Sequence, residues 1–427
     1  MCIAVAKHRQ KYRLDNSTVG RTSNSTKRQS AHGLCFALAA IFALFLLAVP
    51  TAHARRETVL YSFGSQPGDG GDPNLAGVIM DSQGNLYGTT LYGGLSGCDG
   101  QGCGTVFKVT PTRQETVLYS FGSQSGDGYW PNGGLVMDNQ GNLYGTTLQG
   151  GDPSCQEGCG TVFKVSPSGQ ETVIHTFSSQ TGDGYWPFSG LIMDKQGNLY
   201  GTTMSGGANG EGTVFKLTPS GTEAVLYSFG SQYPDGNGPR TDLVMDKDGN
   251  LYGTNFGGTN NCGTVFKVTP SGEETVLYNF GKAGDGCAYE AGLTIDKKGN
   301  LYGTTPDGGE YGVGTVFKVT PSGEETVIYS FGGHAGDGES PSAGLIISDE
   351  GNLYGTTESG GWSHYYGTVF EITHAGAGEE NVIYSFTGGT DGSQPCAGLI
   401  MDARRALYGT TSEGGNNRIG TVFKIAP

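Results

Sequence analysis

The sequence predicts an all-β fold, a seven-bladed β-propeller built from four-stranded antiparallel blades. Three observations lead to this prediction. A unit of about fifty residues with four short parts recurs seven times, each part has the composition of a strand, and the array begins and ends out of phase with its own unit. A closed ring accounts for all three, because the first part of the array can complete the last unit.

The four parts of the unit are called A to D. Part A is an apolar piece such as GLVMD, ending near Asp81, Asp138, Asp194, Asp246, Asp296, Asp349 and Asp402. Part B is LYGTT or a close variant, with its tyrosine at Tyr87, Tyr144, Tyr200, Tyr252, Tyr302, Tyr354 and Tyr408. Part C begins with GTVF at Gly104, Gly160, Gly212, Gly263, Gly314, Gly367 and Gly420. Part D is ETVLYSF or a variant, starting at Glu57, Glu115, Glu171, Glu223, Glu274, Glu325 and Glu380.

Each part is four to seven residues long, rich in β-branched and aromatic residues, and bounded by Gly, Pro, Asn or Asp, as strands are. The chain runs from one part D (57–63) through six complete sets to a final A, B and C over 397–427. We therefore expect strand 57–63 to become the outer strand of the C-terminal blade and to close the ring. An open β-solenoid is the alternative, but it gives no reason for this offset and needs distinct end caps.

Residues 1–54 have the layout of a secretory signal. A basic region precedes the apolar run Leu34–Pro50, and Ala52–His53–Ala54 supplies a small-x-small cleavage site. We expect a signal peptide cleaved after Ala54, leaving one propeller domain over residues 55–427 that is secreted, periplasmic or on the cell surface. Because the basic region is long, an uncleaved anchor or a misplaced start is the alternative, although the apolar run is short for a membrane span.

The charge balance excludes one class of partner. The whole chain carries a formal net charge of −15, and removing the basic leader makes the remainder more acidic still. Nucleic acids and anionic membrane surfaces select for basic patches. We expect neither nucleic acid binding nor a membrane span in the mature chain, which we expect to be a monomer.

Cysteine spacing points to loop disulfides. An oxidising compartment permits short staples. The candidate half-cystines form three pairs, Cys98 with Cys103, Cys155 with Cys159, and Cys262 with Cys287, which leaves Cys396 as the odd residue. The alternative is that the two short Cys pairs form one zinc site. Exported proteins favour disulfides over such a site.

Seven Asp-Gly steps follow part D, and they suggest either turns or calcium sites. Asp-Gly is a strong turn former, since Gly adopts a positive φ and Asp bonds its own backbone. No complete D-x-[DN]-x-[DN]-G ligand series surrounds any of the steps, which begin at Asp69, Asp127, Asp183, Asp235, Asp285, Asp337 and Asp391. We interpret them as turns, and we expect no cofactor and no metal site.

Loop variability indicates where a ligand would bind. Antiparallel strands place the D–A and B–C loops on one face and the short, nearly uniform A–B and C–D loops on the other. Variable loops on a rigid ring tend to carry binding residues. Every aromatic residue of the mature chain outside the repeat template falls in a D–A or B–C loop, namely Tyr92, Tyr129, Trp130, Tyr185, Trp186, Phe188, Tyr233, Phe256, Tyr289, Tyr311, Trp362, Tyr365 and Tyr366.

Two readings of these aromatics stay open. The rings either fold inward and seal the longer loops, as large aromatics often do, or they form a recognition surface suited to sugar rings or a partner protein. The candidates for such a surface are the twin GDGYWP loops on neighbouring blades and the WSHYY segment across the ring. Their residues are Tyr129, Trp130, Tyr185, Trp186, Trp362, His364, Tyr365 and Tyr366.

Few features favour an enzyme. The mature chain has four histidines: His175 replaces the tyrosine of a part D and is expected to pack in that strand, and His374 lies on the uniform face. His334 and His364 with nearby acids could serve a propeller-type lyase or hydrolase. No G-x-S-x-G or H-E-x-x-H motif stands out from the repeats, so we assign no catalytic residue.

The run LYGTT…GG…GTVFKVTPSG…ETVLYSF resembles the bacterial tandem repeat called GloVer, the Gloeo/Verruco type, over essentially all of residues 57–427. The resemblance implies an exported, often surface-associated repeat protein without an established activity. The leading hypothesis is an exported scaffold that holds a glycan or protein ligand on the D–A/B–C face. The alternatives are a propeller-type polysaccharide lyase or hydrolase in the same place, and a purely structural cell-surface protein.

Overall fold

Strands account for nearly all of the regular structure in the computed structural model. The structure describes residues 56–427 apart from 74, 76, 96, 156, 181, 289–291 and 374–378. The predicted signal peptide and its cleavage after Ala54 lie outside these residues, as do Tyr289 and His374. Within the described part of the chain, no helix is long and apolar enough to cross a membrane.

Each repeated part forms a strand. The A strands are β3 (Ile79–Met80), β9 (Val136–Met137), β15 (Ile192–Met193), β20 (Val244–Met245), β24 (Thr294–Ile295), β29 (Ile346–Ile347) and β34 (Ile400–Met401). The B strands are β4 (Leu86–Thr90), β10 (Leu143–Thr147), β16 (Leu199–Thr203), β21 (Leu251–Asn255), β25 (Leu301–Thr305), β30 (Leu353–Thr357) and β35 (Leu407–Thr411).

Parts C and D of each unit also form strands. The C strands are β6 (Thr105–Val109), β12 (Thr161–Val165), β18 (Thr213–Leu217), β22 (Thr264–Val268), β26 (Thr315–Val319), β32 (Thr368–Thr373) and β36 (Thr421–Ile425). The D strands are β7 (Glu115–Ser120), β13 (Glu171–Thr176), β19 (Glu223–Ser228), β23 (Glu274–Asn279), β27 (Glu325–Ser330), β33 (Glu379–Ser385) and β1 (Glu57–Ser62).

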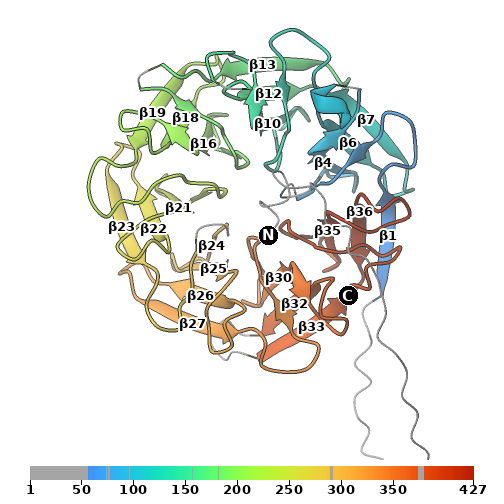
Figure 1. Ribbon diagram of the computed structural model, residues 1–427, viewed down its shortest axis with the longest axis vertical. Helices are drawn as coiled ribbons and strands as arrows, with labels where there is room; N and C mark the ends of the chain where they lie inside the picture. Colours follow the sequence, from blue (N-terminus) through green and yellow to red (C-terminus); the bar gives the residue numbers. More distant parts are fainter. Residues whose placement is uncertain are drawn as a thin grey trace, which may run out of the picture. The chain divides into compact units, whose positions relative to one another are not determined.

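These strands form seven four-stranded sheets, each in the order A, B, C, D. Within residues 55–427, Figure 1 shows the sheets arranged as blades of a ring, with β10, β12 and β13 in succession from the centre outward. Blades 1 to 6 begin with β3, β9, β15, β20, β24 and β29, and blade 7 contains β34, β35, β36 and β1. The predicted seven-bladed propeller is confirmed.

The first strand of the array closes the ring. β1 pairs antiparallel with β36, with Glu57 opposite Ile425 and Ser62 opposite Thr421. This register matches those of the C–D pairs inside the other blades, including a bulge between Val59 and Tyr61. The N-terminal strand therefore supplies the outer strand that the C-terminal blade lacks, as the sequence predicts.

The A strands are shorter than their sequence pattern suggests, with two residues each in the ladder. At two of the seven blades, the glycine before the A strand lies close to the backbone of the neighbouring blade. A Cβ added to Gly190 would lie 2.8 Å from the Gly134 carbonyl oxygen of the neighbouring blade, and one added to Gly77 would lie 3.0 Å from the Gly398 carbonyl oxygen.

Aromatic pairs form the core between blades. The phenylalanine after each D strand packs edge-on against the phenylalanine of the next blade's C strand; Phe121 and Phe163 have ring centroids 4.9 Å apart. The closing interface uses the same contact, with Phe63 and Phe107 at 5.1 Å. All four rings are buried, so the junction between blades 7 and 1 is packed like the others.

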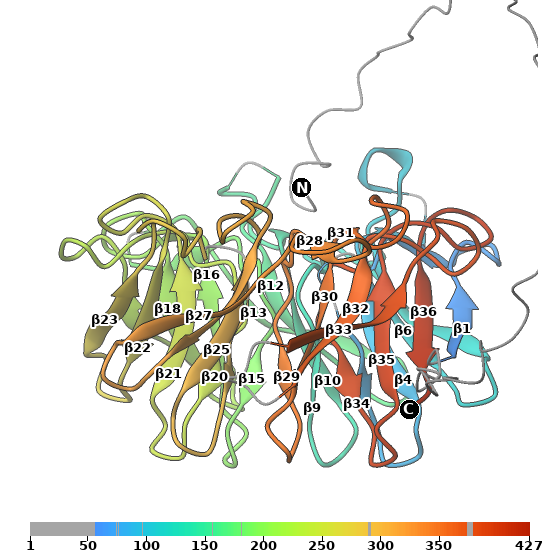
Figure 2. The same cartoon turned by 90° about the horizontal axis from the view of Figure 1, so that it is seen from below.

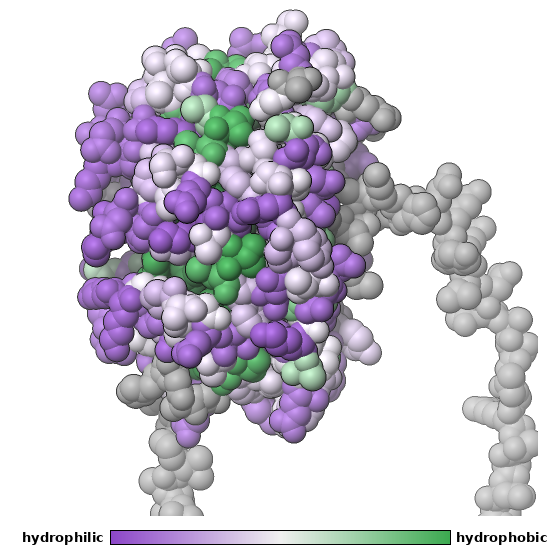
Figure 3. Space-filling view, turned by 90° about the vertical axis from the view of Figure 1, so that its left-hand side faces the viewer, coloured by the Kyte–Doolittle hydropathy of each residue, from purple (hydrophilic) through white to green (hydrophobic). Residues whose placement is uncertain are grey.

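The outer edge of each blade is a D strand with no further partner in its sheet. Figure 3 shows separate apolar patches along this rim, each bordered by hydrophilic residues. A bulge interrupts the C–D ladder in every blade. Bulges reduce edge-to-edge aggregation of exposed strands.

The three predicted disulfides are present: Cys98–Cys103, Cys155–Cys159 and Cys262–Cys287. Cys98 also begins a short 3₁₀ helix, η2 (Cys98–Gly100). The zinc reading of the two short pairs is wrong, because these four sulfur atoms are bonded in pairs. All six cysteines lie in or at the ends of loops on one face of the ring.

Candidate binding face

The D–A and B–C loops lie together on one face, which we call the loop face. Two-residue ladders join them: β2 (Gly70–Gly71) to β5 (Tyr92–Gly93), β8 (Gly128–Tyr129) to β11 (Gln149–Gly150), β14 (Gly184–Tyr185) to β17 (Ser205–Gly206), and β28 (Gly338–Glu339) to β31 (Ser359–Gly360). In Figure 2 these loops, with β28 and β31, crowd the upper edge, while hairpin turns form the lower one.

The twin tyrosine–tryptophan loops are held by contacts within the protein. Trp130 and Trp186 both adopt φ of 60°, which turns the chain towards its A strand. Each ring packs edge-on against the preceding tyrosine, at 5.6 Å for Tyr129–Trp130 and 5.1 Å for Tyr185–Trp186. Trp186 Nε1 donates a hydrogen bond to the Gly158 carbonyl oxygen over 3.2 Å. These four side chains are partly buried, and the two tyrosines contact the inter-blade core.

The WSHYY segment is more open. Trp362 and Tyr365 each expose 73% of their surface, and His364 is also exposed. Tyr366 differs from its neighbour: its ring lies against Gly388, where an added Cβ would approach it to 2.3 Å, and it packs against the core of blades 6 and 7. The segment therefore presents three of its four candidate residues to solvent and uses the fourth to anchor the loop.

The structure does not bring the two candidate groups together. The tyrosine–tryptophan loops connect blade 1 to blade 2 and blade 2 to blade 3, whereas WSHYY connects β30 to β32 in blade 6. Figure 1 places β12 and β13 on the side of the ring opposite to β32 and β33. A small ligand can contact only one of the groups.

Another exposed aromatic residue completes the group at blade 6. Tyr311, in the B–C loop of blade 5, exposes 51% of its surface. Its ring lies over Gly333, where an added Cβ would come within 3.2 Å, and Trp362 lies over Gly336 at 2.8 Å. The glycine-rich loop 332–336 is thus covered on one side by Tyr311 and on the other by Trp362. We call these aromatic residues, together with Tyr365, the blade 5–6 platform.

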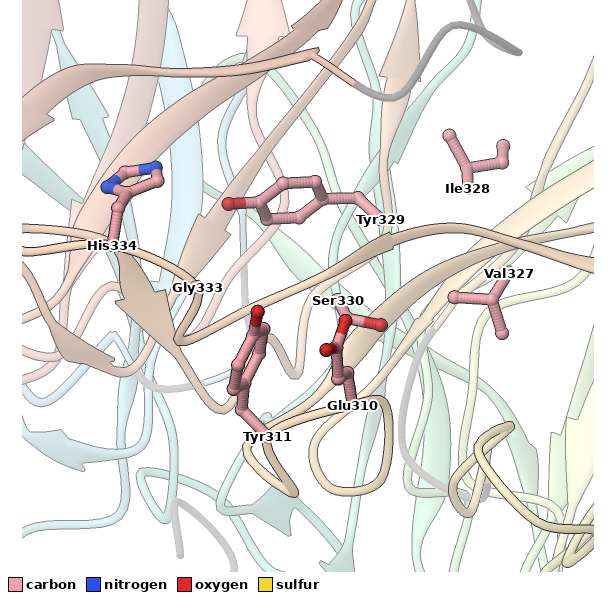
Figure 4. A pocket seen from close by; sticks show the side chains of 8 residues that line it. All are labelled: Glu310, Tyr311, Val327, Ile328, Tyr329, Ser330, Gly333 and His334. Atoms are coloured by element: carbon pink, nitrogen blue, oxygen red, sulfur yellow. The ribbon is translucent and has the colours of Figure 1, made fainter.

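An open hollow of about 370 Å³ adjoins the platform. Figure 4 shows its lining, with the tips of Tyr311 and Tyr329 near His334. The loops contribute Glu310, Tyr311, Gly333 and His334, and β27 contributes Val327, Ile328, Tyr329 and Ser330. The hollow therefore combines aromatic and aliphatic surface with a few polar groups, as ligand sites do.

His334 and Glu380 form a close pair beside this hollow. Their Nε2 and Oε2 atoms are 3.3 Å apart, and the Glu380 side chain is only 1% exposed. Burial, followed by repulsion from Asp337, raises the pKa of Glu380 to about 7, although His334 acts in the opposite direction. Burial lowers the pKa of His334, but the Ala335 carbonyl, Asp337 and Glu380 outweigh it and raise that pKa. The pair is suited to exchanging a proton near neutral pH.

The seven aspartates of the Asp-Gly steps act in the scaffold. Asp337 shows the pattern: its Oδ2 accepts hydrogen bonds from the Tyr329 hydroxyl at 2.8 Å and from the backbone N–H groups of Gly332 and Gly333. In six blades a D-strand tyrosine donates to this aspartate in the same way. The contacts support the reading of these steps as turns.

Sequence reasoning left Tyr311 and Glu380 out of the candidate site residues and named His334 only for the enzyme alternative. The sequence does single out Tyr311 as an aromatic residue outside the repeat template. The sequence does not distinguish Glu380, because every repeat has a glutamate at this position of part D. Only the fold shows that Glu380 faces a histidine from the neighbouring blade.

Another departure from the template lies at the centre of the ring. Asp242 occupies the position at which the other six blades have glycine, and its Oδ1 accepts the Gly190 N–H at 2.6 Å. Solvent reaches its side chain, yet protein atoms surround it closely, and this desolvation raises the pKa of its carboxyl group. Nearby, Arg240 stacks on Phe256, with the guanidinium carbon 4.5 Å from the ring centroid. The sequence alone shows this departure, because Asp242 is a charged residue at a position where the other repeats have glycine.

Comparisons with known proteins agree with this fold. The sequence model of the Gloeobacter/Verrucomicrobia repeat matches residues 43–195, 154–361 and 293–427. No curated protein matches the chain. A solved extracellular domain of a putative hybrid two-component system from B. thetaiotaomicron is similar, with a TM-score of 0.51 and 14% identity.

The similarity to the B. thetaiotaomicron domain covers 86% of this chain, which spans 41% of the length of that one. A gluconolactonase from Xanthomonas campestris has a TM-score of 0.41 and 13% identity, covering 69% of this chain and 85% of that one. At 14% identity, the likeness to the B. thetaiotaomicron domain concerns the fold alone.

Proposed function

The chain belongs to the Gloeobacter/Verrucomicrobia repeat family, and we propose that it is an exported binding protein that holds a glycan on the blade 5–6 platform. The predicted signal peptide and the three disulfides support export, since disulfides persist in oxidising compartments.

One observation carries the proposal: three large aromatic side chains on adjacent loops remain exposed on the loop face. Tyr311 is 51% exposed, and Trp362 and Tyr365 are 73% exposed. Grouped exposed aromatics mark interaction sites, because leaving them in water forgoes their burial energy. The flat C–H face of a sugar ring packs well on such side chains, and its hydroxyl groups can bond to neighbouring polar groups.

Polar groups border the platform as sugar recognition requires. His334 is half exposed, and it lines the hollow together with Tyr311 and the carboxylate-bearing Glu310. Rigid backbone contacts fix the loop: Trp362 donates its N–H to Ser385 Oγ at 2.9 Å, and Ser363 Oγ donates to the Phe386 carbonyl oxygen at 3.3 Å. A preformed surface loses little entropy when a ligand binds.

A glycan array on the purified protein tests this proposal. We expect one class of glycan to bind, and we expect the double variant Trp362→Ala plus Tyr365→Ala to lose at least tenfold in affinity. Tyr233→Ala is the matched control, because Tyr233 is 80% exposed in a loop of another sector, and it should bind normally. Absence of binding to any glycan, or equal loss in the control, would refute the proposal.

The His334–Glu380 pair favours a second candidate, a polysaccharide lyase or hydrolase acting at the same place. His334 would contact the substrate, since its side chain is 51% exposed, while the buried Glu380 would orient it. Chain-length analysis of bound polysaccharides distinguishes the two activities. Shortening of the polymer that disappears in His334→Gln would promote the enzyme; unchanged polymer supports a binding protein.

A further inference from the structure

Blade junctions carry a repeated pair of carboxyl groups. The aspartate of each Asp-Gly step faces the first glutamate of the next blade's D strand, and the two repel each other in all seven junctions. In six junctions a tyrosine hydroxyl donates to the aspartate; for example, Tyr119 donates to Asp127 Oδ2 at 2.7 Å. One junction lacks this tyrosine.

At the junction of blades 2 and 3, His175 of β13 stands in the tyrosine position. It lies beside Asp183, from the loop before β14, and Glu223, the first residue of β19. One ligand atom from each of the three side chains lies within 4.8 Å of the others. Two neighbouring blades therefore contribute a histidine and two carboxylates to one small space.

Each of the three side chains has one potential metal-ligand atom without a hydrogen-bond partner in the described part of the chain. His175 Nε2, Asp183 Oδ1 and Glu223 Oε1 are all buried and have no hydrogen-bond partner among the described residues. The glutamate Oε1 is unpartnered at every junction, but the buried histidine nitrogen occurs only here. Native proteins rarely leave buried polar atoms unpaired, and a bound ion is one of the ordinary explanations.

We propose that His175, Asp183 and Glu223 bind a divalent transition-metal ion, such as Zn²⁺, that links blades 2 and 3. Imidazole nitrogen and carboxylate oxygen both bind Zn²⁺ at about 2.0–2.2 Å. Donors around one tetrahedral ion are then roughly 3.4 Å apart, so small side-chain rotations complete the set. Two carboxylates also balance the ion's charge.

The state of the histidine is compatible with metal binding. Burial lowers the pKa of His175, despite the opposing effect of Asp183, and this favours the neutral ring. A metal needs this neutral form. The ring is also held in place, because it packs edge-on against Phe177 at 4.7 Å. The tyrosine found at the other junctions offers a hydroxyl group that donates to the aspartate and does not bind Zn²⁺ comparably.

A second set of similar composition, His334, Asp337 and Glu380, provides an internal comparison. There Asp337 already accepts four hydrogen bonds: from the Tyr329 hydroxyl, from the N–H groups of Gly332 and Gly333, and from its own neighbour Gly338. His334 is exposed and already bonded to Glu380. Both carboxylate oxygens of Asp337 are thus bonded, whereas Asp183 accepts the Ser178 N–H and hydroxyl through Oδ2 only and keeps Oδ1 unpartnered within the described residues. We therefore assign the ion to the His175 junction.

Titration calorimetry of the tag-free protein, stripped with EDTA, tests the proposal with ZnCl₂. We expect one equivalent to bind with a Kd below about 10 μM, a rise in Tm on adding Zn²⁺, and no comparable response to Ca²⁺. Co²⁺ should give visible absorption bands from an ordered site. His175→Tyr restores the residue of the other six junctions, so it should fold normally without metal and lose both zinc binding and the Tm rise.

The variant His334→Gln is the matched control and should keep full zinc binding. Its folding, like that of His175→Tyr, is checked by Tm in EDTA. If wild-type protein binds no Zn²⁺, or if His175→Tyr binds as well as wild type, the proposal is wrong. Loss of binding in His334→Gln alone would move the site to the blade 5–6 junction and would equally overturn it.

Discussion

Asn416 donates its backbone N–H to the Ser62 hydroxyl over 2.8 Å, although 354 positions separate the two residues. A parallel contact, from Asn417 Nδ2 to the Phe63 carbonyl oxygen at 2.9 Å, lies beside it. The same loop-to-strand contacts occur inside blade 4, where Asn260 Nδ2 donates to the Phe280 carbonyl oxygen at 2.9 Å. The two ends of the array are therefore joined by the interactions that hold an ordinary blade together.

Ring closure predicts that Phe63, directly after β1, stabilises the protein as much as the equivalent phenylalanine of another blade does. Phe63→Ala should destabilise the protein by about 3–5 kcal/mol, since the ring is completely buried. Phe121→Ala removes the equivalent ring between blades 1 and 2, and it should cost a similar amount in chemical denaturation. A loss below about 1 kcal/mol for Phe63→Ala alone would show that the closing interface does not contribute to stability.

The seven D-strand glutamates predict that stability decreases from weakly acidic to weakly basic pH. Burial, and then repulsion from an aspartate, raises their pKa to about 7 from an ordinary 4.5; they are Glu57, Glu115, Glu171, Glu223, Glu274, Glu325 and Glu380. Between about pH 4.5 and pH 7 the folded protein holds protons that the unfolded chain has released, so the free energy of unfolding falls as pH rises.

We expect Tm to be higher at pH 5 than at pH 8 by roughly 5 °C or more at constant ionic strength. The A–B turn aspartates act at lower pH: hydrogen bonds from the turn outweigh burial and lower the pKa of Asp81 below 3.8, so their stabilisation is lost only below that value. A Tm that increases from pH 5 to pH 8 would contradict the prediction.

Neutralising one of these glutamates should stabilise the protein at basic pH. Glu274 is 8% exposed, its Oε2 accepts a hydrogen bond from Gln232 at 3.0 Å, and its Oε1 has no partner in the described structure. Glu274→Gln keeps the acceptor and removes the repulsion from Asp235. We expect Tm to rise by about 1–2 °C at pH 8 and to stay constant at pH 5.

The adjacent residue provides the control for this substitution. Glu273 is exposed, so Glu273→Gln should leave Tm unchanged at both pH values. Equal effects of the two substitutions would mean that net charge, and not the buried pair, controls the pH dependence. A fall in Tm for Glu274→Gln at pH 8 would show that the carboxylate is needed in its charged form.

The glycine of each B strand is required by packing. A Cβ at Gly145 would lie 2.7 Å from Phe163 Cζ and 3.0 Å from Leu135 Cδ2, within the closed core. Gly145→Ala should therefore destabilise the protein by about 1–3 kcal/mol. Gly389→Ala is the control, because the nearest atom to its Cβ is Thr387 Oγ1 at 3.4 Å; it should cost little. Urea unfolding curves compare the two.

The repeat pattern alone was sufficient to predict much of this protein. Strand composition and the offset of part D at Glu57 determined the seven blades, the pairing of β1 with β36 and the shared face of the D–A and B–C loops. These features follow from local alternation and from the need of each blade to cover its apolar face, and both can be read along the chain.

The tertiary structure decided which side chains are available and which groups meet across blades. Tyr365 and Tyr366 are neighbours in sequence, yet only Tyr365 faces solvent, because Gly388 of another loop receives the Tyr366 ring. His175 meets Glu223 through the junction of two blades. Such contacts depend on how separate blades pack in space, and the spacing of residues within a repeat does not specify that packing.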